Sequence, residues 1–267
     1  MKQLLKGFAR KIAPNTFETI QAIRARRHIA RLQQQWGLAP LTARFVDAYG
    51  LTVRGGPFTG MRFTAEPTWC NVVSKLLGCY EGELNLVWER ILATRFDSVV
   101  DVGCADGYFA VGFARCQPDA SVWGYDIDPA CRRVTRKMAQ ENGVADRVKI
   151  RGRCSTRELR QILIGRWLVL SDCEGYEATL IDPKQVPALA HATLVVELHD
   201  QWAPGVFETL LGRLTPTHQC TRIENEPRQP ADYPELAIFP VADANRLLRE
   251  VRPPGNNWLV ATPLADG

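Results

Sequence analysis

The sequence lacks the long apolar runs and the paired cysteines that mark several classes of protein. No stretch of 18 consecutive apolar residues occurs, so no segment is predicted to span a membrane. The first residues have no long apolar stretch before a small-residue cleavage site, and we expect no secretion signal. The eight cysteines are scattered without a C-x-x-C pair, which argues against zinc and against a disulfide framework. We therefore expect a cytoplasmic protein with reduced thiols.

Charge is unevenly distributed along the 267 residues, whose formal net charge is +4. Residues 1–36, here called the basic head, contain eight Lys or Arg side chains against Glu18 alone, so the remainder is mildly acidic. Leu4, Leu5, Phe8 and Ile12 fall on one face of a predicted first helix. Such a helix can lie on an anionic membrane surface, which would make the protein membrane-peripheral. The more common use of such a segment is to pack against the body of the protein.

The hydrophobic content of 46% allows one large α/β domain with an extension. Residues 1–40 are predicted to be a basic helical extension. Residues 41–97 form a mixed lead-in, with short strands around 51–56 and 60–66 and a helix from 81. From residue 98 to 267, strands and helices alternate regularly, as in a domain built on a parallel sheet.

The expected strands of this domain are 98–102, 121–128, 147–152, 167–172 and 193–199, with two closing antiparallel strands near 217–224 and 256–263. One helix is expected from Pro129 to Asn142-Gly143, a favoured start and a typical stop. Ser155 and Glu158 suit a capping box at the start of another helix. Further helices are expected near 205–214 and 241–250. The predicted fold is a Rossmann-like, seven-stranded sheet with helices on both faces.

The segment SVVDVGCADGYFAVGFA, residues 98–114, joins the first strand to a helix that starts near Tyr108 through a turn containing Gly103 and Gly107. This arrangement opens many nucleotide-binding α/β units. A tight turn without a ligand is the alternative. The third glycine of G-x-G-x-x-G would stand at position 108, where this chain has tyrosine. Asp126 follows at the spacing of an acid that binds ribose hydroxyls.

Acidic side chains follow the expected strands at the edge where a ligand would bind. They are Asp101, Asp106, Asp126, Asp128, Asp172, Glu174, Glu197 and Asp200, together with His199, and no Lys or Arg stands among them. A pyrophosphate beside Asp106 would be repelled, by about 4 kcal/mol for like charges 4 Å apart at an effective dielectric constant near 20. A cofactor carrying an ammonium and a sulfonium would be attracted instead. Asp106 acting only as a helix cap is the alternative.

Four motifs, in order, resemble the FkbM-like branch of class I S-adenosylmethionine-dependent methyltransferases. They are DVGCADGYFA, YDIDP, SDCEGYEATLI and VVELHD, of which the run from Asp172 to Glu177 is the most specific. The resemblance covers roughly residues 55–265 and implies S-adenosylmethionine as cofactor. It places the cofactor against Asp101, Gly103, Cys104, Ala105, Asp106, Gly107, Tyr108, Asp126, Ile127, Cys154 and Asp172, with Tyr80 and Glu81 folding over it. The acid that often meets adenine after the third strand is missing, since Arg153-Cys154-Ser155 stands there.

The resemblance implies methyl transfer to a hydroxyl of a small molecule or glycan. A hydroxyl benefits from a general base, for which Glu174 is the first candidate and His199 the second, with Asp172 beside them. A purely structural role is the alternative for each. No metal is expected, because the ligand set of catechol-type enzymes is absent. The alternatives are an RNA methyltransferase, opposed by the acidic edge and the missing base-methylation motif, and a non-catalytic module that docks on a membrane or a protein.

Overall fold

The computed structural model describes residues 14–64, 66, 71–163, 165–250 and 256–264. Seven strands form one sheet in the order β3-β2-β1-β4-β5-β7-β6. The strands are β1 Ser98–Val102, β2 Ser121–Tyr125, β3 Val148–Arg151, β4 Trp167–Ser171, β5 Thr193–Leu198, β6 His218–Ile223 and β7 Asn257–Pro263. β1 to β5 pair in parallel, and β7 is antiparallel to both of its neighbours. The predicted seven-stranded sheet with its closing antiparallel pair is confirmed.

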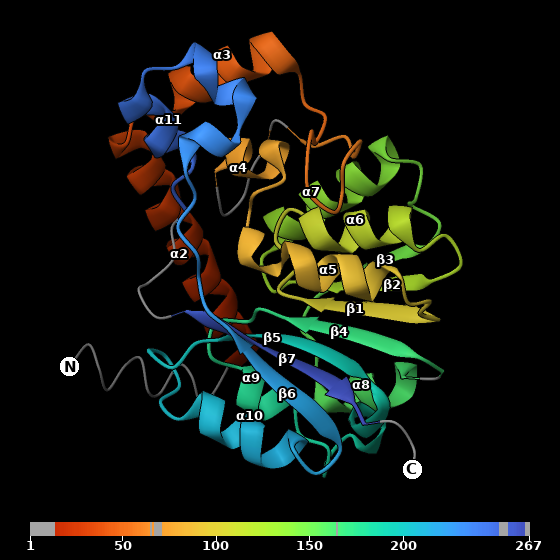
Figure 1. Ribbon diagram of the computed structural model, residues 1–267. Helices are drawn as coiled ribbons and strands as arrows, with labels where there is room; N and C mark the ends of the chain where they lie inside the picture. Colours follow the sequence, from red (N-terminus) through yellow and green to blue (C-terminus); the bar gives the residue numbers. More distant parts are fainter. Residues whose placement is uncertain (1–13, 65, 67–70, 164, 251–255, 265–267) are drawn as a thin grey trace, which may run out of the picture.

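Helices cover both faces of the sheet (Figure 1). α5, α6 and α7 lie on one face, and α8, α9 and α10 on the other. The helices of the main domain are α6 Tyr108–Cys116, α7 Pro129–Glu141, α8 Thr156–Ile162, α9 Glu177–Leu180, α10 Val206–Leu214 and α11 Val241–Leu247. Each face buries its own apolar cluster, and the strands contribute to both because β1 and β4 are buried along their whole length. For this reason, parallel strands that are covered on both faces have nearly continuous apolar sequences.

Local signals in the sequence explain where the helices begin. Pro129 is the first residue of α7, and the side chain of Asp128 caps that helix by accepting a hydrogen bond from the backbone of Ala130. Ser155 and Glu158 form the predicted capping box at the start of α8. A cap of this kind stabilises a helix by about 1 kcal/mol.

The lead-in and the basic head pack against the main domain. They form α2 Pro14–Gln35, α3 Leu38–Tyr49, α4 Val72–Leu77, the short helix η1 Gly82–Leu84 and α5 Asn85–Leu92. α3 spans the predicted boundary at residue 40, and α11 packs on it. The short strands predicted around 51–56 and 60–66 are reduced to one bridge between Thr52 and Arg62. The residues predicted to form the amphipathic start, 1–12, lie outside the described residues.

Helix α2 runs along the side of the sheet where the parallel strands end (Figure 1). The last part of the chain before β7 lies beyond the same edge, in 3-10 helices η3 Pro230–Asp232 and η4 Pro234–Ile238 and in α11. No helix among the described residues is long and apolar enough to cross a membrane. The edge that would bind a ligand is therefore bordered by segments from both ends of the chain.

Candidate functional site

The turn after β1 is held in a conformation that needs glycine. Gly103 has a φ of 90°, and a Cβ atom placed on it would lie 1.7 Å from the backbone oxygen of Asp172. The turn is thus pressed against the end of β4. Only three non-glycine residues of the described chain have positive φ angles: Glu81, Ala105 and Glu174. All three were predicted site residues, and backbone strain of this kind concentrates at functional sites.

Asp126 is fixed by the backbone at the end of β2. Its carboxylate accepts hydrogen bonds from the backbone N–H of Ala105 at 2.9 Å and of Asp128 at 2.7 Å. Burial raises the pKa of Asp126 to about 6. Each carboxylate oxygen has a second lone pair, so the side chain can still accept from the two hydroxyls of a ribose.

Asp101 and Asp106 lie close together behind this turn, and both are buried. Burial raises the pKa of Asp101 to about 7. In the described part of the chain, Oδ2 of each side chain has no hydrogen-bond partner. A buried polar atom without a partner costs about 1–3 kcal/mol. The two orphan oxygens therefore suit an incoming ammonium group, as the amino-acid end of S-adenosylmethionine would supply.

A buried lysine from the lead-in corrects the expectation that this edge has no cation. Nζ of Lys75, on α4, lies 2.6 Å from Oδ1 of Asp106, and both side chains are almost fully buried. The same ammonium lies 4.5 Å from the ring centre of Tyr80 and 5.5 Å from that of Tyr108. Asp106 does not cap α6, whose N-cap is Gly107 without a side-chain hydrogen bond. Lys75 therefore offsets the repulsion expected between Asp106 and a pyrophosphate. The charge of Asp106 alone does not exclude a cofactor that contains a pyrophosphate.

The basic head supplies a second cation to this edge. Nε of Arg26, on α2, lies 2.6 Å from Oδ2 of the buried Asp128. Asp128 is two residues beyond Asp126, so α2 is attached next to the candidate ribose acid. At least this part of the head packs on the body. Contact of the head with a membrane stays a prediction.

The other predicted cofactor residues occupy several places. Tyr80 and Tyr108 pack edge to face, with ring centres 5.8 Å apart. Glu81 is buried, and its backbone N–H donates to Glu250 at 3.0 Å. Cys104 is buried at the turn, and Ile127 is half-buried between Asp126 and Asp128. Cys154 is buried in the apolar cluster on the α8 side of the sheet, and burial raises the pKa of its thiol.

A second group of side chains, the carboxylate–histidine cluster, gathers at the ends of β4 and β5. It consists of Asp172, Glu174, Glu177, Glu197 and His199. Nδ1 of the buried His199 lies 2.7 Å from Oε1 of Glu177. Its Nε2 lies 3.3 Å from Glu197 and 3.6 Å from both Asp172 and Glu174. The structure thus brings together the three predicted catalytic residues.

Two members of the cluster had no predicted role. Glu177 is fully buried, and its Oε1 also accepts from the backbone N–H groups of Cys173 and Gly175. The helix it begins, α9, has only four residues. Glu197 was noted at a strand end, without a role. The signal for Glu177 was its place in the same motif as Asp172 and Glu174, three residues after the latter.

The surrounding carboxylates change the protonation of the histidine. Although burial opposes the charge, hydrogen bonds to Glu177 and Glu197 raise the pKa of His199 to about 12. His199 is therefore an imidazolium at neutral pH and is not available to accept a proton. Burial raises the pKa of Glu174, whose side chain is still 55% exposed. Burial and the charge of Glu197 raise the pKa of Asp172. Glu174 is the member of the cluster most open to an incoming molecule.

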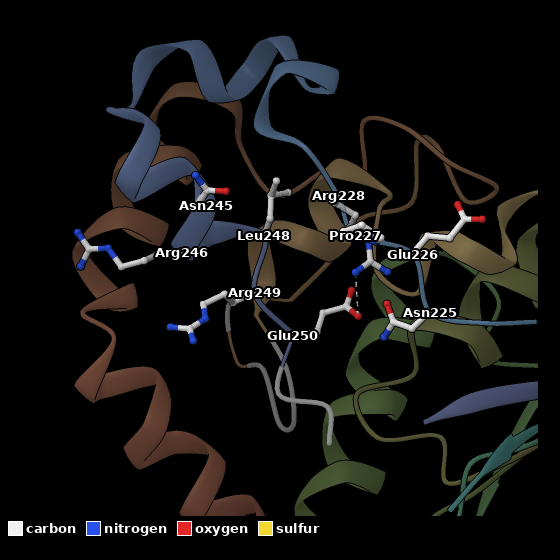
Figure 2. Close-up of a pocket in the computed structure, with 9 residues that line it drawn as sticks. All are labelled: Asn225, Glu226, Pro227, Arg228, Asn245, Arg246, Leu248, Arg249 and Glu250. Carbon is white, nitrogen blue, oxygen red and sulfur yellow. Dashed lines mark ion pairs between the residues drawn. The ribbon is translucent and has the colours of Figure 1, made fainter. Parts of the chain in front are cut away.

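A polar cavity of about 490 Å³ lies between the segment after β6 and α11 (Figure 2). Arg228, Arg249 and Glu250 are among the residues that line it. Arg228 is paired with Glu250 at 3.2 Å and with Glu83 of η1 at 2.8 Å. Because Glu250 also accepts the backbone N–H of Glu81, the cavity borders the residues predicted to cover the cofactor.

Comparisons with known proteins bear on the fold. No family model matches the chain. A release factor glutamine methyltransferase of Gloeobacter violaceus is 30% identical over 104 residues, covering 38% of this chain and 32% of that protein. A ribosomal protein L11 methyltransferase of Haemophilus influenzae is 37% identical over 67 residues, covering 25% and 22%. The chain therefore spans about a third or less of these curated relatives.

The chain was also compared with solved structures. The O-methyltransferase TomG of Streptomyces achromogenes, in complex with S-adenosylmethionine, is 15% identical, covers 68% of this chain and 79% of its own, and has a TM-score of 0.46. An O-methyltransferase of Bacillus cereus with S-adenosylhomocysteine is 13% identical over 69% and 80%, with a TM-score of 0.44. The sheet order β3-β2-β1-β4-β5-β7-β6, with helices on both faces, is a Rossmann-like α/β fold. This fold is the one expected from the resemblance, while the FkbM-like branch itself stays a prediction.

Proposed function

We propose that this protein is an S-adenosylmethionine-dependent methyltransferase of the FkbM-like branch that methylates a hydroxyl oxygen of a small molecule or glycan. The observation that carries the proposal is the placement of two acidic groups on one sheet edge. The first, at β1 and β2, has the fixed carboxylate and the orphan oxygens that suit the cofactor. The second, at β4 and β5, is open to an acceptor at Glu174. The turn at Gly103 brings the two groups into contact through Asp172.

The first group would hold the cofactor by its polar ends. Asp126 accepts from the ribose hydroxyls, with its position set by two backbone N–H groups. Asp101 and Asp106 would receive the ammonium of the amino-acid end, and Lys75, paired with Asp106, would supply a cation for its carboxylate. Charged hydrogen bonds of this kind contribute about 1.5–3 kcal/mol each. When bound, S-adenosylmethionine supplies a methyl group that its sulfonium has already activated.

The second group would prepare the acceptor. Because His199 already carries its proton, Glu174 is the residue that takes the proton of the hydroxyl. A positioned general base contributes about 10²–10⁴-fold to rate. Alignment of the hydroxyl with the methyl group supplies the rest, as in other positioned reactions. The polar lining of the cavity beside Glu81 suits an acceptor rich in hydroxyl groups.

Methyl transfer from radiolabelled S-adenosylmethionine tests the proposal. The full chain would be incubated with panels of sugars, polyols, glycans, protein and RNA, and products would be identified by mass spectrometry. Label on a hydroxyl oxygen is expected. Label on RNA or on a protein side chain would overturn the proposed acceptor. Binding of S-adenosylhomocysteine without transfer to any panel would instead favour the non-catalytic module.

A further inference from the structure

We propose that the carboxylate–histidine cluster binds a divalent cation of the Mn²⁺ type, with Asp172, Glu174 and His199 as ligands. The inference rests on the proposed methyl transfer and adds a chemical component to the same site. It departs from the expectation of no metal, which depended on the absence of a sequence motif. The structure brings the ligands together from two strand ends that lie 25 residues or more apart along the chain.

The spacing of the ligand atoms suits one cation. One ligand atom from each of Asp172, Glu174 and His199 lies within 4.8 Å of the others. Nε2 of His199 is 3.6 Å from both carboxylates. A cation with bonds of about 2.1 Å places adjacent ligand atoms roughly 3.0–3.4 Å apart. The two distances from Nε2 are within a few tenths of an ångström of this range, whereas the ligand atoms lie up to 4.8 Å apart, so the carboxylates must move closer together on binding. Glu174, being exposed, is the residue placed to make this movement.

Glu177 orients the histidine for this role. It binds Nδ1 at 2.7 Å and leaves Nε2 directed at the carboxylates. The cation replaces the proton that Nε2 carries in the free protein, so metal binding releases one proton. Metal-binding histidines almost always have a carboxylate or carbonyl on their other ring nitrogen, which fixes the ring and its tautomer. Glu177 is itself held by the backbone N–H groups of Cys173 and Gly175, so the ring is positioned by the loop that carries Asp172 and Glu174.

The buried polar groups around the cluster are a second observation. Asn256, immediately before β7, is 3% exposed, and its Nδ2 donates to Oε1 of Glu197 at 3.1 Å. Its Oδ1 is buried without a hydrogen-bond partner among the described residues. The other oxygen of Glu197 lies 3.3 Å from Nε2 of His199. Within the cluster itself, Oε2 of the fully buried Glu177 also has no hydrogen-bond partner among the described residues. The cluster therefore holds an unsatisfied carboxylate oxygen, and carboxylate oxygens are the ligands that hard divalent cations prefer.

Charge supports the same conclusion. Along the described chain, His199 is the only cationic side chain that forms an ion pair with Asp172, Glu174 or Glu177. At the other end of the edge, by contrast, Asp106 and Asp128 have a lysine and an arginine. Mixed carboxylate and imidazole ligands favour Mn²⁺ among the common hard cations, because imidazole is a weak ligand for Mg²⁺ and Ca²⁺.

The cation would act on the acceptor hydroxyl. A bound divalent cation lowers the pKa of an oxygen that it coordinates. The hydroxyl then loses its proton to a carboxylate, and its oxygen forms the new C–O bond as the S–CH₃ bond breaks and S-adenosylhomocysteine leaves. A carboxylate has two oxygens, so Glu174 can bind the cation through one and take the proton through the other.

Titration with Mn²⁺ tests the inference on the full chain after removal of metal with a chelator. Electron paramagnetic resonance of free Mn²⁺ would count the sites, and we expect one per chain. Glu174→Gln and Asp172→Asn should each weaken binding at least tenfold. Glu208→Gln, an exposed acid on α10, is the matched control and should leave binding unchanged. Circular dichroism would verify the fold of each variant, and Glu174 is exposed enough for its variant to fold.

Failure of this inference differs from failure of the proposed function. S-adenosylhomocysteine binding is measured calorimetrically on the same metal-free protein. If the protein binds S-adenosylhomocysteine but shows no stoichiometric Mn²⁺ binding up to millimolar concentration, the cation site alone is overturned. Mn²⁺ binding that survives both cluster substitutions would also overturn it. Loss of S-adenosylhomocysteine binding in the unaltered protein would overturn the methyl-transfer proposal, whatever the metal result.

Discussion

The two halves of the sheet edge compensate their acids differently. At β1 and β2, Asp106 is paired with Lys75 and Asp128 with Arg26, both from upstream of the main domain. At β4 and β5, four carboxylates surround one histidine. Upstream segments therefore supply cations that pair with acids of the first half, while the second half keeps excess negative charge. We attribute the first half to holding a cofactor and the second to acting on an acceptor.

The largest expected effect is on the acceptor half. Glu174→Gln keeps the size of the side chain, removes its charge and should lower the methyl-transfer rate by about 10²–10⁴-fold. Affinity for S-adenosylhomocysteine should hardly change, since Asp101, Asp106 and Asp126 remain. The rate is measured with the acceptor found in the labelling screen, and Glu208→Gln serves as control. Near-native turnover of the Glu174 variant would leave it only a structural role.

Breaking the ion pair between Lys75 and Asp106 in the cofactor half should have the next largest effect. Lys75→Met leaves the buried carboxylate of Asp106 uncompensated and should lower the free energy of unfolding by about 3–5 kcal/mol. In the protein that remains folded, affinity for S-adenosylhomocysteine should fall about tenfold or more, because the lysine would no longer supply a cation for the carboxylate of the ligand. Calorimetry with 5′-methylthioadenosine provides the control, since that compound has no amino-acid end. Equal losses for both ligands would contradict the placement of Lys75.

The pH dependence of S-adenosylhomocysteine affinity tests the cofactor half, and the expected effect is smaller. With its pKa near 7, Asp101 is largely protonated below neutral pH in the free protein. Binding an ammonium requires the ionised form, so affinity for S-adenosylhomocysteine should fall as pH drops below about 7, by up to tenfold per unit. Calorimetry at pH 6, 7 and 8 would measure it. Affinity that is flat over this range would mean that Asp101 does not meet the ammonium.

The smallest effect is expected from the basic head. Arg26→Gln removes the charge from an ion pair whose carboxylate is buried, and leaving the Oδ2 atom of Asp128 without this partner should cost about 1–3 kcal/mol. Asp128 keeps its hydrogen bond to the N-terminus of α7, so the fold should persist. We expect a fall of a few degrees in Tm, and less than a threefold change in ligand affinity. A larger loss of affinity would show that α2 takes part in the cofactor site.

The sequence predicted most of the main domain because its signals are local. Alternating strands and helices, Pro129 and the Ser155–Glu158 capping box each fix an element within a few residues of themselves, and all are confirmed. The short strands predicted around Thr52 are only one bridge, Thr52 with Arg62, supported by a few backbone hydrogen bonds between the two segments. The structure of this region depends on contacts with distant segments. Local periodicity in the sequence carries no information about such contacts.

The site was predicted less completely for the same reason. The positions of Asp101, Asp126 and His199 at strand ends follow from the order of the elements. The order of the elements does not predict the position of Lys75. Its partner Asp106 is 31 residues away, and only packing of α4 against the turn brings the two together. The pKa of His199 likewise depends on Glu177 and Glu197, which three-dimensional structure alone places around its ring.

The central claim, that this sheet edge binds S-adenosylmethionine, is tested most directly by calorimetry of the unmodified full chain. Titrations with S-adenosylhomocysteine and with NAD would be carried out side by side at pH 8, where Asp101 and Asp126 are ionised. The account predicts binding of one S-adenosylhomocysteine per chain and weaker binding of NAD, a ribose-containing cofactor with a pyrophosphate and without the ammonium that suits Asp101 and Asp106. NAD binding of equal or greater affinity, or no binding of S-adenosylhomocysteine, would contradict it.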